Sequence, residues 1–89
     1  MDYEWDEAKR RSNLAVHGVD FNDVVHFDWE TAIEVEDTRH DYGEKRFIVY
    51  GLLGDRMTVL IYTQRRTAIR IISWRKANDR EIRYYDSQI

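Results

Sequence analysis

The sequence predicts an α+β fold in which helices cover an antiparallel four-stranded sheet. Three observations support this prediction: two capped helical segments near the N-terminus, β-branched and aromatic runs in the middle, and a helical pattern at the end. Short links between the strand-like runs favour an antiparallel meander. The 89 residues contain no linker-like stretch and no repeat, so we expect a single domain over 1–89 with the order α-α-β-β-β-β-α.

Two helices are expected in the N-terminal third. Asp6 is a favoured N-cap residue for a helix over 7–17, and Gly18 is the residue type preferred just beyond a helix end. Asp20 offers a second N-cap for a short helix over 21–27, where aromatic and β-branched residues lie near one face.

The middle of the chain changes to a period of two. In residues 31–37 apolar residues alternate with glutamates, which is typical of a half-buried strand. Three β-branched and aromatic runs predict three more strands, at 46–53, 57–63 and 68–73. The link Gly54-Asp55-Arg56 makes the first two of these runs a hairpin. From about residue 76 a final helix is expected, with Asn78 or Asp79 as its cap.

Charge is distributed unevenly along the chain. The formal net charge is -3, but residues 1–44 hold 13 acidic side chains and four Lys or Arg, whereas residues 45–89 hold four acidic side chains and ten Lys or Arg. Such asymmetry indicates one surface that binds a polyanion and another that is self-shielded or binds a cationic partner. The alternative is that both sets of charges are only solvated.

The composition excludes several classes of protein. With no cysteine, the chain has no disulfide, thiolate nucleophile, zinc ribbon or iron–sulfur cluster. It also lacks the glycine-rich nucleotide loops and the short hydrolase motifs. No uncharged stretch is long enough for a bilayer and no signal peptide is evident, so we expect a cytoplasmic protein without membrane contact. We predict no cofactor and no metal site.

Cations within the strand runs are the main candidate functional residues. They are Arg46, Arg70, Arg75 and Lys76. With Tyr50 and Tyr62 interleaved, they would form a basic patch that cradles a phosphodiester and stacks its flanking bases. The alternative is that the two strand arginines pair only with glutamates of adjacent elements: Glu34, Glu36 or Glu44.

Two further side chains have open interpretations. Histidine is the usual residue for proton transfer near neutral pH, and His17 is the candidate here. Because His17 stands at the end of a predicted helix, it could instead bind a free carbonyl or favour the helix dipole. Trp74 lies beside the candidate cations and could either stack on a base or belong to the core.

Several short motifs follow one another between residue 4 and about residue 85. They are Glu4-Trp5-Asp6 with Lys9, Asn13, His17-Gly18-Val19 with Phe21, Gly43-Glu44-x-Arg46, Gly51, Tyr62-Thr63, and Arg70-Ile71-Ile72-Ser73-x-Arg75-Lys76-Ala77 with Glu81 and Tyr84 or Tyr85. In order and spacing they resemble the BrnT family of toxins from bacterial type II toxin–antitoxin systems. The chain departs from that pattern at Trp74, where a small residue is usual, at Lys45, and in lacking a proline after the second helix.

The resemblance implies a RelE-like ribonuclease fold, RNA cleavage that inhibits translation, and neutralisation by a cognate antitoxin. That antitoxin would carry a ribbon-helix-helix domain, form a hetero-oligomer with the toxin, and contact operator DNA on its behalf.

With this resemblance, we expect a metal-independent RNA endonuclease. Arg46 and Arg70 would stabilise charge on the phosphate, and His17 or Tyr62 would transfer protons. The expected substrate-binding residues are Arg75, Lys76, Tyr50 and Trp74. The alternative is a non-catalytic module that binds RNA or the antitoxin with the same basic sheet.

Overall fold

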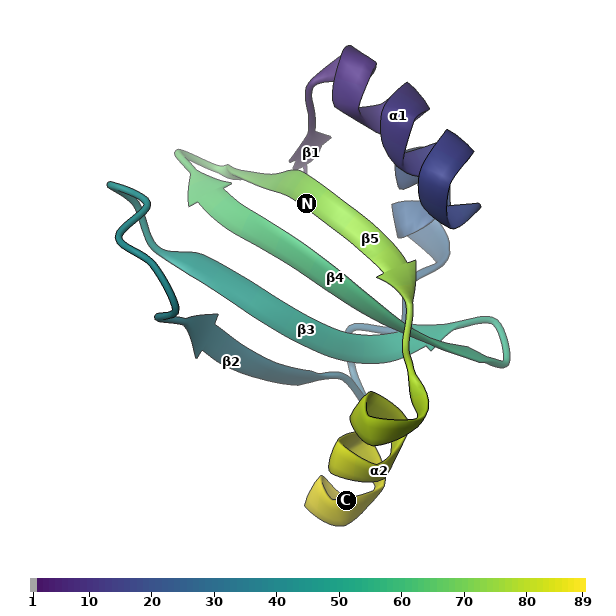
Figure 1. The fold of residues 1–89 in the computed structure, drawn as a ribbon. Helices are drawn as coiled ribbons and strands as arrows, with labels where there is room; N and C mark the ends of the chain where they lie inside the picture. The colour runs from purple at the N-terminus through teal and green to yellow at the C-terminus, as the bar shows by residue number, and fades with distance from the viewer. Residues whose placement is uncertain (1) are drawn as a thin grey trace.

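The computed structural model describes residues 2–89, and its central feature is a five-stranded sheet with the strand order β1-β5-β4-β3-β2 (Figure 1). The strands are β1 (Asp2–Glu4), β2 (Ile33–Asp37), β3 (Arg46–Leu53), β4 (Arg56–Arg65) and β5 (Ala68–Lys76). The helices are α1 (Glu7–His17), the short 3-10 helix η1 (Phe21–His26) and α2 (Asp79–Gln88). The α+β class is therefore confirmed.

The predicted four-stranded antiparallel sheet is wrong in one respect, because a fifth strand is present. β1 pairs with β5 in parallel, with Tyr3 opposite Ile69 and Glu4 opposite Arg70. The other four strands form the expected antiparallel meander. A strand of three residues shows no periodicity, so only its pairing with a distant part of the chain identifies it.

The predicted helix caps are confirmed. The carboxylate of Asp6 accepts hydrogen bonds from the first turn of α1, at 2.9 Å from Ala8 N and 3.2 Å from Lys9 N. Gly18 has φ +71° and its amide donates to a carbonyl of the last turn. Asp20 caps η1, which is a 3-10 helix rather than an α-helix, and Asn78 caps α2 in a capping box.

β5 continues to Lys76, three residues beyond its predicted end. A bulge shifts the register between β4 and β5: Ile61 is opposite Ser73, but Tyr62 is opposite Ile71. This extra residue changes which face each later side chain of β5 occupies, so the period of two is lost. Trp74 consequently lies on the same face as Ile71.

One face of the sheet carries the core. Its fully buried side chains include Leu60 and Trp74, which pack against aromatic and β-branched residues of η1 and the segment after it. The indole Nε1 of Trp74 donates to Thr58 Oγ1 at 2.9 Å. Trp74 is thus a core residue, which decides between its two interpretations. Gly51 belongs to the same face, where a Cβ would lie 2.5 Å from the Phe27 ring.

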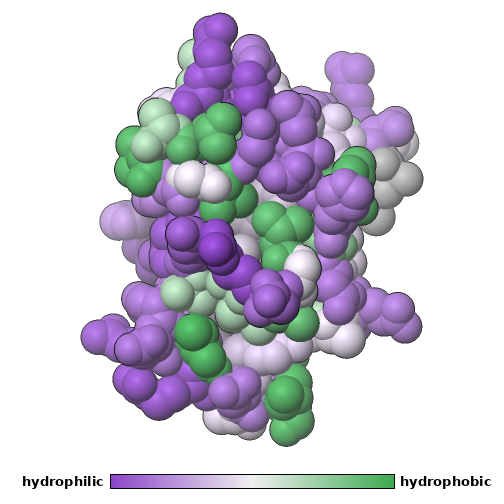
Figure 2. Space-filling model, turned by 90° about the vertical axis from the view of Figure 1, so that its right-hand side faces the viewer, coloured by the Kyte–Doolittle hydropathy of each residue, from purple (hydrophilic) through white to green (hydrophobic). Residues whose placement is uncertain are grey.

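The outside of the molecule is mainly polar. On the side that Figure 2 shows, hydrophobic surface stands in separate small patches among hydrophilic side chains. The large hydrophobic residues with the most exposed side chains are Val16, Val25 and Ile89. Within residues 2–89, neither α-helix has the length and apolar character that crossing a membrane requires.

Candidate functional site: a cationic cavity on the open face of the sheet

Arg46 and Arg70 lie on the same face of the sheet, one on each side of Thr63. Thr63 of β4 is opposite Arg46 of β3 and opposite Arg70 of β5. Since neighbouring strands are about 4.8 Å apart, the Cα atoms of the two arginines are roughly 10 Å apart. Two long guanidinium side chains at this spacing can bind one anion placed above Thr63. The structure therefore brings together the two arginines that the sequence singled out.

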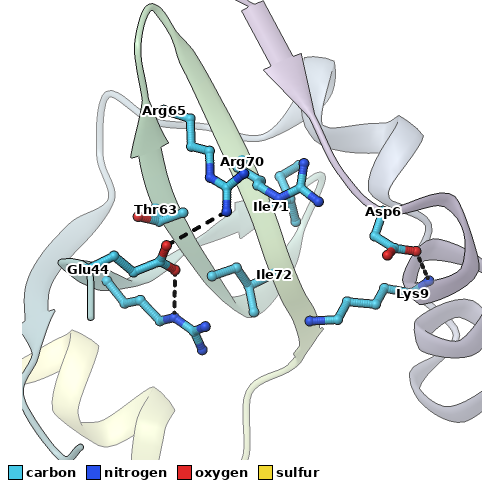
Figure 3. Close-up of a pocket in the computed structure, with 9 residues that line it drawn as sticks. Asp6, Lys9, Glu44, Thr63, Arg65, Arg70, Ile71 and Ile72 are labelled. Carbon is cyan, nitrogen blue, oxygen red and sulfur yellow. Dashed lines mark hydrogen bonds and ion pairs between the residues drawn. The ribbon is translucent and has the colours of Figure 1, made fainter. Parts of the chain in front are cut away.

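A cavity of about 160 Å³ opens over this row of residues (Figure 3). It is lined by Asp6, Lys9, Glu44, Arg46, Thr63, Arg65, Arg70, Ile71 and Ile72. Lys9 reaches from α1 toward Ile72, while Glu44 and Arg65 lie on the opposite side of the cavity (Figure 3). Four of these side chains are cationic and two are acidic, so the cavity, which we call the arginine cavity, suits an anion.

Acidic side chains pair with the cavity arginines. Glu44 accepts from Arg46 Nε at 3.1 Å and lies 3.9 Å from Arg65, and Glu4 accepts from Arg70 at 2.8 Å. The predicted pairing of Arg46 with Glu44 is thus present. These side chains are 26–54% exposed, and ion pairs this accessible to water contribute about 0–1 kcal/mol. A phosphate group can therefore replace either carboxylate at little cost.

Glu44 differs from the other polar groups of the arginine cavity. The Asp6 carboxylate is occupied by the cap of α1, and the Thr63 hydroxyl donates to Lys45 O at 2.7 Å. The Glu44 carboxylate, by contrast, accepts a hydrogen bond from the mobile end of a side chain, the Arg46 guanidinium. Glu44 can therefore exchange its partner for a substrate group, including a hydroxyl whose proton it could accept.

His17 lies beside the arginine cavity rather than in it. A second hollow of about 190 Å³ is lined by Lys9, Ser12, Asn13, Val16, His17 and Ile72, so the two hollows share Lys9 and Ile72. The His17 side chain is exposed at the end of α1. An elongated ligand in the arginine cavity could extend to this imidazole.

Tyr62 lies on the core face, so its predicted place in the basic patch is wrong. It is opposite Phe47 and Ile71, its side chain is 8% exposed, and its hydroxyl donates to Glu34 at 2.6 Å. Burial and the Glu34 carboxylate raise the pKa of Tyr62 well above its usual range. The sheet separates Tyr62 from the arginine cavity, and Trp74 is separated from it in the same way.

Arg75 and Tyr50 lie on the same face of the sheet as Arg46 and Arg70, but at the other end of that face, where α2 packs. The Arg75 guanidinium binds Glu81 through two hydrogen bonds of 2.8 and 2.7 Å, and the Tyr50 ring packs against Tyr84 at a centroid distance of 4.9 Å. The hydrogen bond with Glu81 raises the pKa of Arg75, and burial raises the pKa of Tyr50. Both residues therefore anchor α2. Lys76 is exposed at the end of β5 and is opposite Thr58.

The sequence interpretation missed three of the cavity residues: Lys9, Glu44 and Arg65. Lys9 reaches the cavity only because α1 packs against β5. Glu44 was considered only as a counter-ion, although it belongs to one of the motifs. Arg65 falls between the strands expected at 57–63 and 68–73, whereas in the structure it is the last residue of β4. Among residues 2–89, His, Asp and Glu side chains form no cluster of three or more that could hold a metal ion.

The fold and the arginine cavity together define a small α+β domain with a cavity of mainly cationic lining on one face of its sheet. The family model of the ribonuclease toxin BrnT of type II toxin-antitoxin systems matches residues 5–81. The chain therefore belongs to the BrnT toxin family, as the motifs predicted. A toxin of a type II system has an antitoxin as its partner. No curated protein matches the chain.

Proposed function

We propose that this toxin cleaves RNA in the arginine cavity and thereby inhibits translation. The proposal depends mainly on one observation, the placement of Arg46 and Arg70 on either side of Thr63 above a common cavity. Two guanidinium groups bind phosphate oxygens in a fixed geometry, and Lys9 adds a third positive charge from α1. The family's description as a ribonuclease toxin supports RNA as the source of that phosphate.

The reaction we propose is a metal-independent transesterification. The 2′-oxygen of a ribose attacks the adjacent phosphorus, the bond from phosphorus to the 5′-oxygen breaks, and the products end in a 2′,3′-cyclic phosphate and a 5′-hydroxyl. The proton of the 2′-hydroxyl goes to a base, and the leaving 5′-oxygen receives a proton from an acid. Arg46, Arg70 and Lys9 stabilise the negative charge that builds on the non-bridging oxygens.

Glu44 and His17 are the groups we propose for the two proton transfers. Glu44 is the proton acceptor, because its carboxylate lies in the cavity beside Arg46 and bonds to side chains that a phosphate can engage instead. His17 is the donor, because it lines the hollow that adjoins the arginine cavity at Lys9 and Ile72. Tyr62 has no part in this proposal.

The partner and regulation we propose follow from the family. The cognate antitoxin carries a ribbon-helix-helix domain, forms a hetero-oligomer with the toxin in the cytoplasm, and contacts operator DNA on behalf of both proteins. The RelE-like relationship of the fold belongs to the same proposal and is supported by the α+β architecture.

Induced expression and an RNA cleavage assay test the proposal together. Arg46→Ala and Arg70→Ala should each lower the cleavage rate by about 10²–10³-fold and abolish growth arrest, while unfolding remains cooperative. Arg56→Ala is the matched control, because Arg56 is an exposed arginine at the other end of β4. If both cavity variants remain fully toxic, the proposed role is wrong. If the wild type binds RNA with salt dependence but leaves it intact, the non-catalytic alternative is correct.

A further inference from the structure

A third hollow, of about 420 Å³, lies next to the arginine cavity and is lined by Glu4, Arg65 and Arg66. Arg65 lines both hollows, and Glu4 pairs with Arg70 of the arginine cavity. The second hollow joins the arginine cavity on its other side through Lys9. The three hollows therefore adjoin one another, with Lys9 between the first pair and Arg65 between the second.

Arg66 occupies a strained backbone position. It lies in the two-residue turn between β4 and β5, and its φ of +55° is the only positive φ of a non-glycine residue within residues 2–89. Glycine is the residue that adopts this conformation without steric conflict, whereas a Cβ is disfavoured there. In the described part of the chain, the Arg66 guanidinium makes no ion pair and no hydrogen bond.

The strain at Arg66 has no compensating contact within the fold. Its exposed side chain adds nothing to packing, and glycine would fit the turn better. The two-residue hairpin requires a positive φ, which glycine would supply without strain, and a strained non-glycine residue at such a position is characteristic of functional sites. The turn carries Arg66 beside Arg65, whose ion pair with Glu44 spans 3.9 Å. Two adjacent and weakly engaged guanidinium groups at a hollow are suited to a phosphate.

We propose that the hairpin of Arg65 and Arg66 is a second phosphate subsite, which binds the RNA backbone beside the nucleotide that is cleaved. The inference rests on the proposed function, because it takes the arginine cavity as the place of cleavage. From Thr63 to Arg65 the chain advances about 7 Å along β4, comparable to the step between neighbouring phosphates in an extended strand. The substrate is therefore an extended single strand whose phosphates lie along the adjoining hollows.

Binding of non-cleavable 2′-O-methyl oligonucleotides to Arg66→Gln and Arg56→Gln tests the subsite. Both substitutions remove one exposed arginine near a hairpin of β4, but Arg66 lines the third hollow and Arg56 does not. Each phosphate contact contributes about 0.7 to the slope of log K against log salt for a single strand, which corresponds to about four-fold in affinity at 0.15 M salt. Arg66→Gln should weaken the binding of an octanucleotide by this factor and lower the salt dependence of that binding by about 0.7 in slope. The affinity for a dinucleotide should be unchanged.

Arg66→Gly separates binding from folding. Because glycine relieves the strained φ, its Tm should equal the wild-type value or exceed it by up to about 5 °C, while octanucleotide affinity falls as in Arg66→Gln. If Arg66→Gln and Arg56→Gln bind the octanucleotide equally well, the proposed subsite is wrong. It is also wrong if Arg66→Gln loses as much affinity for the dinucleotide as for the octanucleotide. A loss of affinity for poly-glutamate but not for RNA assigns the hairpin to a protein partner instead. If the wild type binds neither oligonucleotide, the proposed function itself fails.

Discussion

Glu44→Gln removes a negative charge from the arginine cavity while preserving the size of the side chain. Glu44 lies 3.1 Å from Arg46 Nε and 3.9 Å from Arg65, so a phosphate that replaces it on these guanidinium groups would lie beside the displaced carboxylate. That places the carboxylate roughly 6 Å from the phosphate. The Glu44 side chain is 29% exposed, and screening by water then limits the repulsion to about 1 kcal/mol.

The two possible roles of Glu44 predict the same effect on RNA binding but different effects on cleavage. Loss of the repulsion should tighten RNA binding about five-fold, whichever role is correct. If Glu44 accepts the 2′-hydroxyl proton, cleavage at saturating RNA should slow by about 10²–10⁴-fold. If Glu44 is only a counter-ion, cleavage should be unchanged or faster.

Glu4→Gln is the matched control for this prediction. Glu4 pairs with Arg70 at 2.8 Å and its side chain is 40% exposed, but it does not line the arginine cavity. We expect Glu4→Gln to tighten binding of a 2′-O-methyl oligonucleotide without slowing cleavage of the matching RNA. The assay measures the binding constant on the first oligonucleotide and the single-turnover rate on the second. A Glu44→Gln rate equal to that of Glu4→Gln would refute the proton-acceptor role.

Two further predictions concern stability. Asn13 is 8% exposed and bonds to Val19 O, Trp74 O and Trp74 N, so Asn13→Ala should lower the free energy of unfolding by about 2–4 kcal/mol in urea titrations. A loss below 1 kcal/mol would contradict the structural role of this bridge. The Arg39 guanidinium lowers the pKa of Asp37 in the folded protein. Because the unfolded state therefore binds this proton more readily, the stability of the fold should decrease as the pH falls below about 4. Asp37→Asn should lower the free energy of unfolding at pH 7 by about 1–2 kcal/mol and make stability less dependent on pH below about 4. If the loss of stability in acid is unchanged in this variant, Asp37 is not its cause.

The helix ends were predictable because their determinants are local. Asp6 and Gly18 cap the two ends of α1 through contacts within a few residues, so the sequence is sufficient to locate these ends. β1 was not predicted because the strand it pairs with lies more than 60 residues away. The bulge in β5 was not predicted for a related reason, since only the register of β5 against β4 defines it.

The error at Tyr62 shows how a single residue in a turn affects a predicted site. The sequence interpretation treated Gly54-Asp55-Arg56 as a three-residue link, which would place Tyr62 opposite Ile48 and on the face of Arg46. The actual turn contains two residues, because Arg56 already pairs with Leu53. A shift of one residue moves every side chain of a strand to the other face, so Tyr62 turns to the core. Arg46 and Arg70 share a face because each lies opposite Thr63, one in the register of β3 with β4 and the other in the register of β4 with β5.

The central claim is that RNA is cleaved in the arginine cavity by its own 2′-hydroxyl. An octanucleotide of DNA with one ribose at a site that the wild-type protein cleaves in RNA tests this claim most directly, with Arg70→Gln assayed beside the wild type. We expect one cut, after the ribose, with a 2′,3′-cyclic phosphate on one product, and a loss of about 10²–10³-fold in rate for Arg70→Gln. Cleavage of the all-DNA octanucleotide, or full activity of Arg70→Gln on the single ribose, would contradict the account.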